Sequence, residues 1–432
     1  MSALRDIILG TPVAALAEPY RLAAMNAPNT PPTTAMAAAQ PGAAPASTGR
    51  MTTAEILARL VAFDTTSRNS NLKLIEFVRG YLDAQGVAYR VSTDEIKQKA
   101  NIHAIVGPQA AGGVALSGHV DTVPVEGQAW SADPFTLRRD GGNLYARGAC
   151  DMKGFVASCL AAVPDFQAKQ LKRPLHLFIS YDEETDFGGV ERLVADLQES
   201  DLKPALCVVG EPSGMKPIIA HKGRLSLNVR VRGRPGHSSE PAKGVNAIHA
   251  AGEAIAWVAA EARRLAQEGP FAEAFDPPHT TIQVGTVQGG SILNIIPEHA
   301  EFSMEWRNVP NDDAERHLAR LKAFVATAIE PAMHAVHPAT GFSFEIINLM
   351  PRLALDPNHE LATVVKQLTN SNSAGTVSYG TEGGYYQNAG IPTIICGPGY
   401  IAQAHQPDEF VAQSELDACD AFIRRLADRL LT

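Results

Sequence analysis

The stretch Ser117-Gly118-His119-Val120-Asp121-Thr122-Val123-Pro124 places a histidine and an aspartate in a turn that follows the apolar run 114–117. Polar side chains in turns after strands gather at one edge of an open sheet, where such folds place their sites. Four later segments are marked in the same way by glycine, proline or acidic residues. They read Gly148-Ala149-Cys150-Asp151-Met152-Lys153-Gly154, Asp182-Glu183-Glu184-Thr185, Val209-Gly210-Glu211-Pro212 and Ala404-His405-Gln406-Pro407-Asp408-Glu409.

These segments supply a set of candidate metal ligands. The five residues are His119, Asp151, Glu184, Glu211 and His405. Two imidazoles and three carboxylates suffice to hold two zinc-like ions if one carboxylate is shared. So few ligands leave coordination positions open for water, as hydrolysis requires. A weaker alternative is that His119 and Asp121 form a surface pair and that 182–186 is a solvated acidic run.

Size and composition indicate a globular protein. The chain has 432 residues, 45% hydrophobic and 19% charged, which is enough for two or three domains with real cores. The net charge of −9 and the pI near 5.8 argue against a nucleic-acid partner, which would need clustered basic residues. No run of about 18 apolar residues occurs, so no membrane span is expected.

The cysteines predict a reducing location. There are five of them, an odd number in a long chain, and no Cys-x-x-Cys pair occurs. A disulfide framework is therefore not expected, and a cytoplasmic location is the better interpretation. Cys150, beside Asp151, is an alternative nucleophile, but the metal interpretation already explains its surroundings.

The first 50 residues differ from the rest. They are rich in Ala, Pro, Thr and Ser, as in the run 29–39, and we expect a low-complexity, disordered extension. They lack the compact charged-then-apolar layout of a secretion signal. Met51 begins the first well-patterned segment, so an over-called start codon is an alternative explanation.

Two kinds of pattern follow Met51 and predict two domains. Strands, acid-bearing loops and helices alternate over 51–221 and again over 351–432, which is typical of an α/β domain. Between them, 222–350 reads strand, helix, strand, strand, helix, strand, the ferredoxin-like α+β order. The predicted strands there are 224–232, 280–287, 300–307 and 342–348, and the predicted helices are 245–265 and 312–329. We expect a discontinuous catalytic domain interrupted by this smaller domain.

From Met51 to the end, the chain resembles the dinuclear-zinc aminoacylase and carboxypeptidase family, known as M20. The resemblance rests on the five ligand segments and three further stretches. These are Gly380-Thr381-Glu382-Gly383-Gly384, Cys396-Gly397-Pro398-Gly399 and Ala402-Gln403-Ala404-His405-Gln406-Pro407-Asp408-Glu409-Phe410. It implies a zinc-peptidase-like catalytic domain, with a mixed central sheet flanked by helices, and an inserted lid and dimerisation domain. The chain would then be a homodimer.

The family pattern implies a role for each ligand. Glu184 and His405 would hold one ion, His119 and Glu211 the other, and Asp151 both, with a cis peptide between Asp151 and Met152. Zinc suits mixed imidazole and carboxylate ligands, and cobalt or manganese are alternatives.

The resemblance also implies the catalytic groups. Asp121 would orient the His119 ring. Glu183 would be the general base that takes a proton from water and delivers it to the leaving amine. His237, in Gly236-His237-Ser238-Ser239, would polarise the scissile carbonyl across a dimer interface. An ordinary loop histidine is the alternative for that residue.

Further residues resemble substrate-binding segments of the family. Asn294 and Arg307 would hold the substrate carboxylate, which a guanidinium matches in geometry. Arg307 as a plain surface charge is the alternative. Gly380 and Thr381 would offer backbone amides, and Glu382 would attract an ammonium group of the substrate.

The stretches around Gly380 and His405 are most similar to the bacterial enzymes that deacetylate N2-acetyl-L-ornithine to ornithine and acetate in arginine biosynthesis. The expected partner is thus a small N-acyl amino acid, with no nucleic acid or membrane. Acetylcitrulline, succinyl-diaminopimelate or a carboxypeptidase substrate are alternatives within the same chemistry. A metal-binding protein without catalysis is the alternative from another class, and the intact Glu183-Glu184 pair argues against it.

Overall fold

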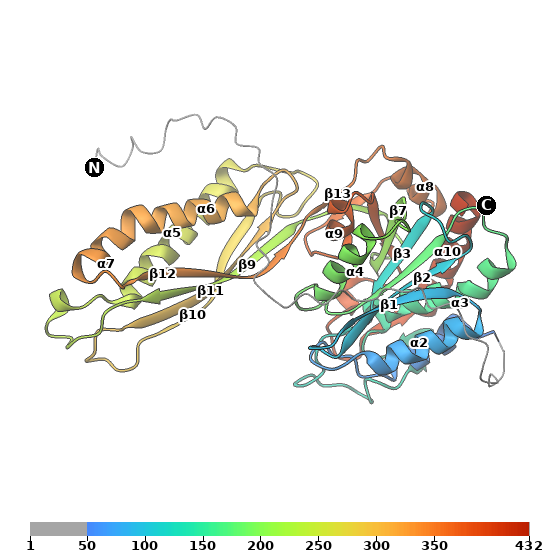
Figure 1. Ribbon diagram of the computed structural model, residues 1–432, viewed down its shortest axis with the longest axis horizontal. Coiled ribbons are helices and arrows are strands. Elements are labelled where there is room, and N and C mark those ends of the chain that lie inside the picture. Colours follow the sequence, from blue (N-terminus) through green and yellow to red (C-terminus); the bar gives the residue numbers. More distant parts are fainter. Residues whose placement is uncertain (1–49, 432) are drawn as a thin grey trace. The chain divides into compact units, whose positions relative to one another are not determined.

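The computed structural model describes residues 50–431, and Figure 1 shows its helices and strands. The low-complexity extension predicted for residues 1–50 lies, except for Arg50, outside the described residues. In the described part, no helix is both long enough and apolar enough to cross a membrane.

Helices and strands alternate along most of the chain. The α-helices are α1 (Thr53–Val61), α2 (Leu72–Ala84), α3 (Gly154–Ala168), α4 (Gly188–Gln198), α5 (Ala247–Glu268), α6 (Ala314–Phe324), α7 (Glu330–Val336), α8 (Glu360–Leu368), α9 (Gly383–Asn388) and α10 (Gln413–Leu431). The strands are β1 (Ala88–Asp94), β2 (Lys99–Val106), β3 (Val114–His119), β4 (Arg138–Asp140), β5 (Asn143–Tyr145), β6 (Leu175–Ser180), β7 (Leu206–Pro212), β8 (Ile218–His221), β9 (Gly223–Arg232), β10 (Thr281–Gly289), β11 (His299–Asn308), β12 (Gly341–Met350), β13 (Leu353–Ala354), β14 (Gly375–Val377), β15 (Thr393–Gly397) and β16 (Phe410–Ala412).

The larger sheet is mixed, as predicted. Its strand order is β1-β2-β6-β3-β7-β15-β8-β13, with β14 beside β8. The four neighbouring strands β6, β3, β7 and β15 are parallel to one another, whereas β1, β2 and β13 pair with their neighbours in antiparallel fashion. The parallel strands all end at the same edge of the sheet, which makes that edge the natural place for a site.

Helices cover both faces of this sheet. In β6, Leu177 and Ile179 pack into the apolar core that contains residues of α1, α2, α3, α8 and α10, while Phe178 packs into the core formed with α4 and α9. Successive strand residues point to opposite faces, so an entirely apolar run such as β6 fits a strand buried on both sides.

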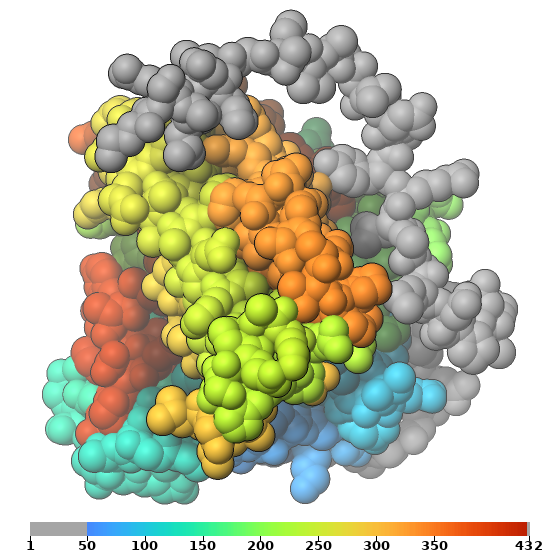
Figure 2. Space-filling view, turned by 90° about the vertical axis from the view of Figure 1, so that its left-hand side faces the viewer, coloured from blue at the N-terminus to red at the C-terminus, as the bar shows by residue number. Residues whose placement is uncertain are grey.

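The smaller sheet lies entirely within residues 223–350. Its order is β10-β11-β9-β12, all antiparallel, and α5 and α6 cover one of its faces in Figure 1. Leu225, Leu227 and Val229 of β9 are buried with Trp306 under these helices, while the intervening residues are more exposed. Figure 2 shows the surface of this region, with α5 in yellow-green and α7 in orange.

Several short elements differ from the sequence prediction. β4, β5 and β16 form a separate three-stranded sheet, and strands of this length are too short for a period-two pattern to be visible. Helix α3 begins at Gly154 and continues to Ala168 with Pro164 inside it, although proline usually ends or kinks a helix. The helix expected over 312–329 is interrupted by a π-turn at Val325–Ile329 and resumes as α7.

Candidate dinuclear metal centre

The candidate ligands come from the carboxyl ends of the parallel strands. His119 is the last residue of β3, Glu211 lies near the end of β7, and Glu184 is in the turn after β6. His405 lies in the loop that follows β15, and Asp151 lies in the turn that precedes α3. The peptide bond between Asp151 and Met152 is cis, as the family resemblance implied.

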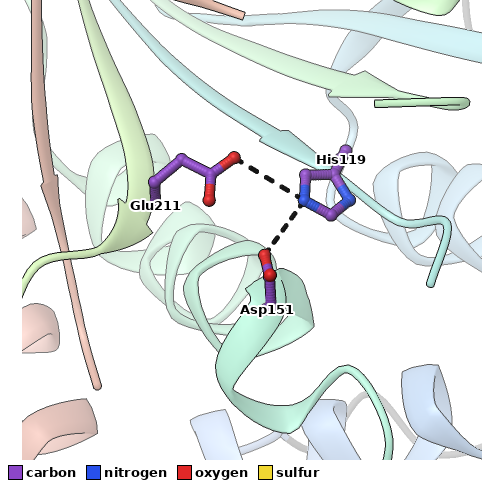
Figure 3. Close-up of side chains that lie close together, drawn as sticks. All are labelled: His119, Asp151 and Glu211. Carbon is purple, nitrogen blue, oxygen red and sulfur yellow. Dashed lines mark hydrogen bonds and ion pairs between the residues drawn. The ribbon is translucent and has the colours of Figure 1, made fainter. Parts of the chain in front are cut away.

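One group consists of His119, Asp151 and Glu211, and Figure 3 shows their side chains converging. The Nε2 atom of His119 lies 3.2 Å from Oδ1 of Asp151 and 3.7 Å from Oε1 of Glu211. All three residues are buried, and their ligand atoms lie within 4.8 Å of one another.

A second group consists of Asp151, Glu184 and His405. The Nε2 atom of His405 lies 3.0 Å from Oε1 of Glu184 and 3.3 Å from Oδ2 of Asp151. Asp151 therefore presents one carboxylate oxygen to each group. This is the arrangement that a carboxylate shared between two ions would need.

The electrostatics of the site fit a pair of divalent cations. Burial and repulsion from Asp151 raise the pKa of Glu211 well above its ordinary value, and burial and repulsion from Glu211 do the same for Glu183. The same causes, burial first and then Asp151, raise the pKa of Glu184 to about 6. Oε1 of Glu211 is buried without a hydrogen-bond partner. Cations at this position would relieve the repulsion and satisfy that oxygen.

Asp121 contacts residues of both groups and holds them in position. The Nδ1 atom of His119 lies 3.1 Å from the main-chain oxygen of Asp121 and 3.4 Å from its carboxylate. The Asp121 carboxylate accepts hydrogen bonds from the backbone N–H groups of Glu183 at 3.1 Å and Glu184 at 3.3 Å, and from the Ser67 hydroxyl at 2.7 Å. Asp121 thus orients the His119 ring and also fixes the acidic turn; the sequence alone had indicated only the first contact.

A buried ion pair, which the sequence interpretation missed, joins the Asp151 turn to the His405 loop. The Glu409 carboxylate accepts hydrogen bonds from the backbone N–H groups of Cys150 at 2.9 Å and Asp151 at 3.0 Å, and from the Arg147 guanidinium at 2.7 Å. Glu409 and Arg147 are each only 1% exposed. The available signal was an acidic residue four positions after His405 and an arginine four positions before Asp151.

Of the predicted residues of the inserted segment, His237 and Asn294 lie close together, whereas Arg307 is near the far end of β11. His237 is exposed, its Nδ1 atom lies 2.7 Å from the Ser239 hydroxyl, and it forms a β-bridge with Ile295, beside Asn294. Arg307 lies on β11 and pairs with Glu305 at 3.3 Å. None of His237, Asn294 and Arg307 forms a hydrogen bond or ion pair with the five candidate ligands in the described structure.

The Gly380 segment has surroundings that the sequence did not indicate. A Cβ atom on Gly380 would collide with the side chain of Met350, and the Thr381 hydroxyl accepts a hydrogen bond from the backbone of Gly383. Glu382 is 1% exposed, and its carboxylate accepts hydrogen bonds from the hydroxyls of Ser117 and Ser180. In the described structure these two hydroxyls enclose the Glu382 carboxylate, and its contact with a substrate ammonium group stays a prediction.

The cysteines are all buried and unpaired. Burial, and then the charges of Glu409 and Asp151, raise the pKa of the Cys150 thiol. A reactive cysteine needs the opposite shift, so the structure gives no support to Cys150 as a nucleophile.

The residues from 115 to 429 match the model of peptidase family M20/M25/M40. The chain belongs to this family. An acetylornithine deacetylase from Yersinia pseudotuberculosis serotype O:1b (strain IP 31758) is 34% identical over 372 residues, which cover 85% of this chain and 93% of the relative.

Solved structures of the family share the fold. Aminopeptidase PepT from Bacillus cereus ATCC 10987 has a TM-score of 0.66 at 21% identity, covering 86% of this chain and 96% of its own. A dinuclear metal binding M20 peptidase, the YXEP protein of Bacillus subtilis, has a TM-score of 0.60 at 14% identity, covering 87% and 97%. This M20 chain is therefore a hydrolase with the M20 peptidase fold, a mixed sheet flanked by helices.

Replacing Glu409 with glutamine should weaken metal binding. The amide would place N–H groups where the carboxylate now accepts bonds from Arg147 and from the Asp151 backbone, so the shared ligand would lose its support. We expect a loss of about 10- to 100-fold in metal affinity, the usual cost of losing such a supporting partner. Competition with a chromophoric chelator measures it, with Glu360→Gln on the exposed surface of α8 as the control. Unchanged affinity in a folded Glu409→Gln protein would contradict the assignment.

Metal affinity should also rise with pH. Hydrogen bonds to Asp151 and Glu184 raise the pKa of His405 to about 10 in the metal-free protein, so this ring is protonated at neutral pH. A metal ion needs the neutral ring and must displace that proton, which becomes easier as the pH approaches 10. We expect affinity to increase by up to about tenfold per pH unit for each proton displaced. Calorimetry between about pH 6.5 and about pH 8, in two buffers of different ionisation enthalpy, counts the released protons. Binding without proton release would show that His405 is not a ligand.

Proposed function

We propose that this M20 hydrolase removes the acetyl group of N2-acetyl-L-ornithine, giving ornithine and acetate. The observation that carries the proposal is the match to an acetylornithine deacetylase over 85% of this chain and 93% of the relative. The site supports the same chemistry, because a carboxylate without a ligand role, Glu183, lies beside two groups that could hold metal ions.

We assign His119, Asp151 and Glu211 to one ion and Asp151, Glu184 and His405 to the other. Mixed nitrogen and oxygen ligands suit zinc, with cobalt or manganese as alternatives. When bound, two such ions supply Lewis acidity that polarises the acyl carbonyl and activates water.

Glu183 is the proposed general base. Its raised pKa, caused by burial and by repulsion from Glu211, makes the carboxylate a stronger proton acceptor than an exposed glutamate. It takes a proton from the attacking water and then delivers that proton to the departing α-nitrogen. The Asp121 carboxylate accepts a hydrogen bond from the backbone N–H of Glu183 at 3.1 Å. This bond fixes the backbone position from which the Glu183 side chain extends.

The inserted segment supplies the proposed substrate contacts. His237 would donate a hydrogen bond to the oxygen on which negative charge develops. Asn294 and Arg307 would hold the carboxylate of the N-acyl amino acid. Gly380 and Thr381 stay proposed as the backbone edge of the substrate site. A substrate this small needs closure of the protein around it to exclude water.

The Glu183→Gln variant tests the reaction and its base together. Glutamine cannot accept the proton, so kcat on N2-acetyl-L-ornithine should fall by about 100- to 10,000-fold while both metal ions stay bound. Ornithine release is measured alongside metal content, with acetylcitrulline and succinyl-diaminopimelate as comparison substrates. If the wild type hydrolysed only another acyl amino acid, the assigned site would stand and the proposed substrate would be wrong. Full activity of the variant would remove Glu183 from the mechanism.

We further propose that the protein is a cytoplasmic homodimer. Its five buried, unpaired cysteines fit a reducing location.

A surface hollow of about 840 Å³ in the inserted segment, bordered by α5, α7 and the loop 289–297, contains none of the candidate ligands. Ile292 and Leu293 on this loop are 59% and 98% exposed, and exposed apolar residues of this kind favour a partner surface.

Mixing two inactive variants tests whether His237 acts across the dimer. If it does, a heterodimer of His237→Ala and Glu183→Gln contains one complete site and one site lacking both groups. Random exchange of subunits should then restore about one quarter of the wild-type activity, because half of the dimers are mixed. Light scattering checks the oligomeric state. No recovery in mixtures that demonstrably exchange subunits would place His237 in its own subunit's site, and full activity of His237→Ala alone would place it outside the mechanism.

A further inference from the structure

Two arginines face each other across neighbouring strands of the smaller sheet. Arg224 is the second residue of β9 and is directly opposite Arg307 of β11. Their chain neighbours Leu225 and Trp306 are buried under α5 and α6, so both arginines point to the face that these helices do not cover. Like charges in this arrangement repel each other.

The two guanidinium groups differ in what balances their charge. Arg307 pairs with Glu305 at 3.3 Å. Arg224 forms no ion pair with any residue of the described chain. Its hydrogen bonds run from Nε and Nη2 to one amide oxygen, Oδ1 of Asn348, at 3.4 and 3.3 Å, and its guanidinium lies 5.9 Å from the Phe187 ring centroid. A guanidinium has five N–H donors, so Arg224 keeps donors for another acceptor.

Arg224 is also close to the proposed chemistry. It lies three residues after the end of β8, at the point where the chain passes from the larger sheet to the smaller one. Phe187, beside it, precedes α4 and is three residues from Glu184. The carboxylates whose charges act on the Arg224 guanidinium are Glu305 and then Glu183.

An unbalanced cation here has an energetic cost. Burial, followed by repulsion from Arg307, lowers the pKa of the Arg224 guanidinium. A half-buried charge without a partner usually destabilises the folded protein unless something else supplies the opposite charge. The charges of Glu305 and Glu183 reach Arg224 only from beyond ion-pair distance, so we explain the missing close anion as part of a ligand.

We propose that Arg224 binds the free carboxylate of the substrate, acting beside Arg307 as a second guanidinium. The inference rests on the proposed function, which provides an N-acyl amino acid with such a carboxylate. Arg307 is already engaged by Glu305, so Arg224 supplies the uncommitted positive charge. A planar guanidinium can hold a carboxylate through two parallel N–H bonds. The site would therefore select acyl amino acids with a free carboxylate over their amides and esters.

The test compares one substrate with a derivative that lacks the negative charge of its α-carboxylate. Wild type and Arg224→Gln are assayed on N2-acetyl-L-ornithine and on its α-carboxamide, in which the charge is absent. We expect Arg224→Gln to lower kcat/KM on the acid by about 10- to 100-fold and to have little effect on the amide, which the wild type already uses poorly. Arg224→Lys keeps the charge but not the forked geometry, and should lie between the two on the acid.

Arg230→Gln is the matched control, because Arg230 lies on the same strand and face but pairs with Glu301 and Glu345. Thermal unfolding of the ligand-free proteins checks folding, and Arg224→Gln should be at least as stable as wild type, since it removes an unpaired charge. Equal losses on acid and amide, or no loss on the acid, would overturn the proposal. Wild-type inactivity on N2-acetyl-L-ornithine would instead count against the proposed substrate, and the comparison would move to the acid and amide of the acyl amino acid that is hydrolysed.

Discussion

The concentration of negative charge at one edge of the larger sheet is the constraint on which the rest of the site depends. Asp151, Glu184, Glu211 and Glu183 lie within interaction distance of one another in a largely buried place, and burial, followed by their mutual repulsion, raises the pKa of the three glutamates. A fold holds such a cluster only if rigid elements force it together. The parallel strands β6, β3, β7 and β15 do so, because each ends at the same edge.

The contacts around the candidate ligands hold the negatively charged side chains in position and do not neutralise them. Asp121 and Glu409 are themselves carboxylates, yet both act mainly as acceptors for backbone N–H groups of the ligand segments. A carboxylate that accepts such bonds fixes a turn without offering a competing positive charge to the ligands. Arg147 pairs with Oε2 of Glu409, while the backbone N–H groups of Cys150 and Asp151 donate to Oε1. The ligands are left facing inward with their charge available to a metal ion.

Much of the fold could be predicted from the sequence, and the reasons are physical. The apolar runs that become β3, β6 and β7 are buried on both faces, and they end at glycine, proline or acidic residues that cannot continue a buried strand. The five candidate ligands could be selected because each follows such a signal. The strands predicted over 224–232 and 300–307 are found as β9 and β11, in which buried and more exposed residues alternate because one face of the sheet carries no helices.

The contacts that could not be predicted are those made between segments far apart in the chain. The spacing of Glu409 from His405 does not show that its carboxylate reaches the backbone of Asp151, and nothing near Glu382 indicates that it is enclosed by Ser117 and Ser180. The pairing of Arg224 with Arg307 depends on the register between β9 and β11. The pattern within each strand shows which face a residue lies on but not which residue of the other strand is opposite it.

The place of His405 in the chain has a consequence for how the protein is made. Because residues 223–350 stand between Glu211 and His405, the ribosome must produce the whole smaller sheet before the second ligand group can be completed. The first group needs nothing beyond β7, and Glu409 joins the Asp151 turn only after nearly the whole polypeptide has emerged. The protein can therefore bind both metal ions only near the end of its biosynthesis. A polypeptide that stops within the inserted segment lacks both His405 and Glu409 and cannot complete the second ligand group.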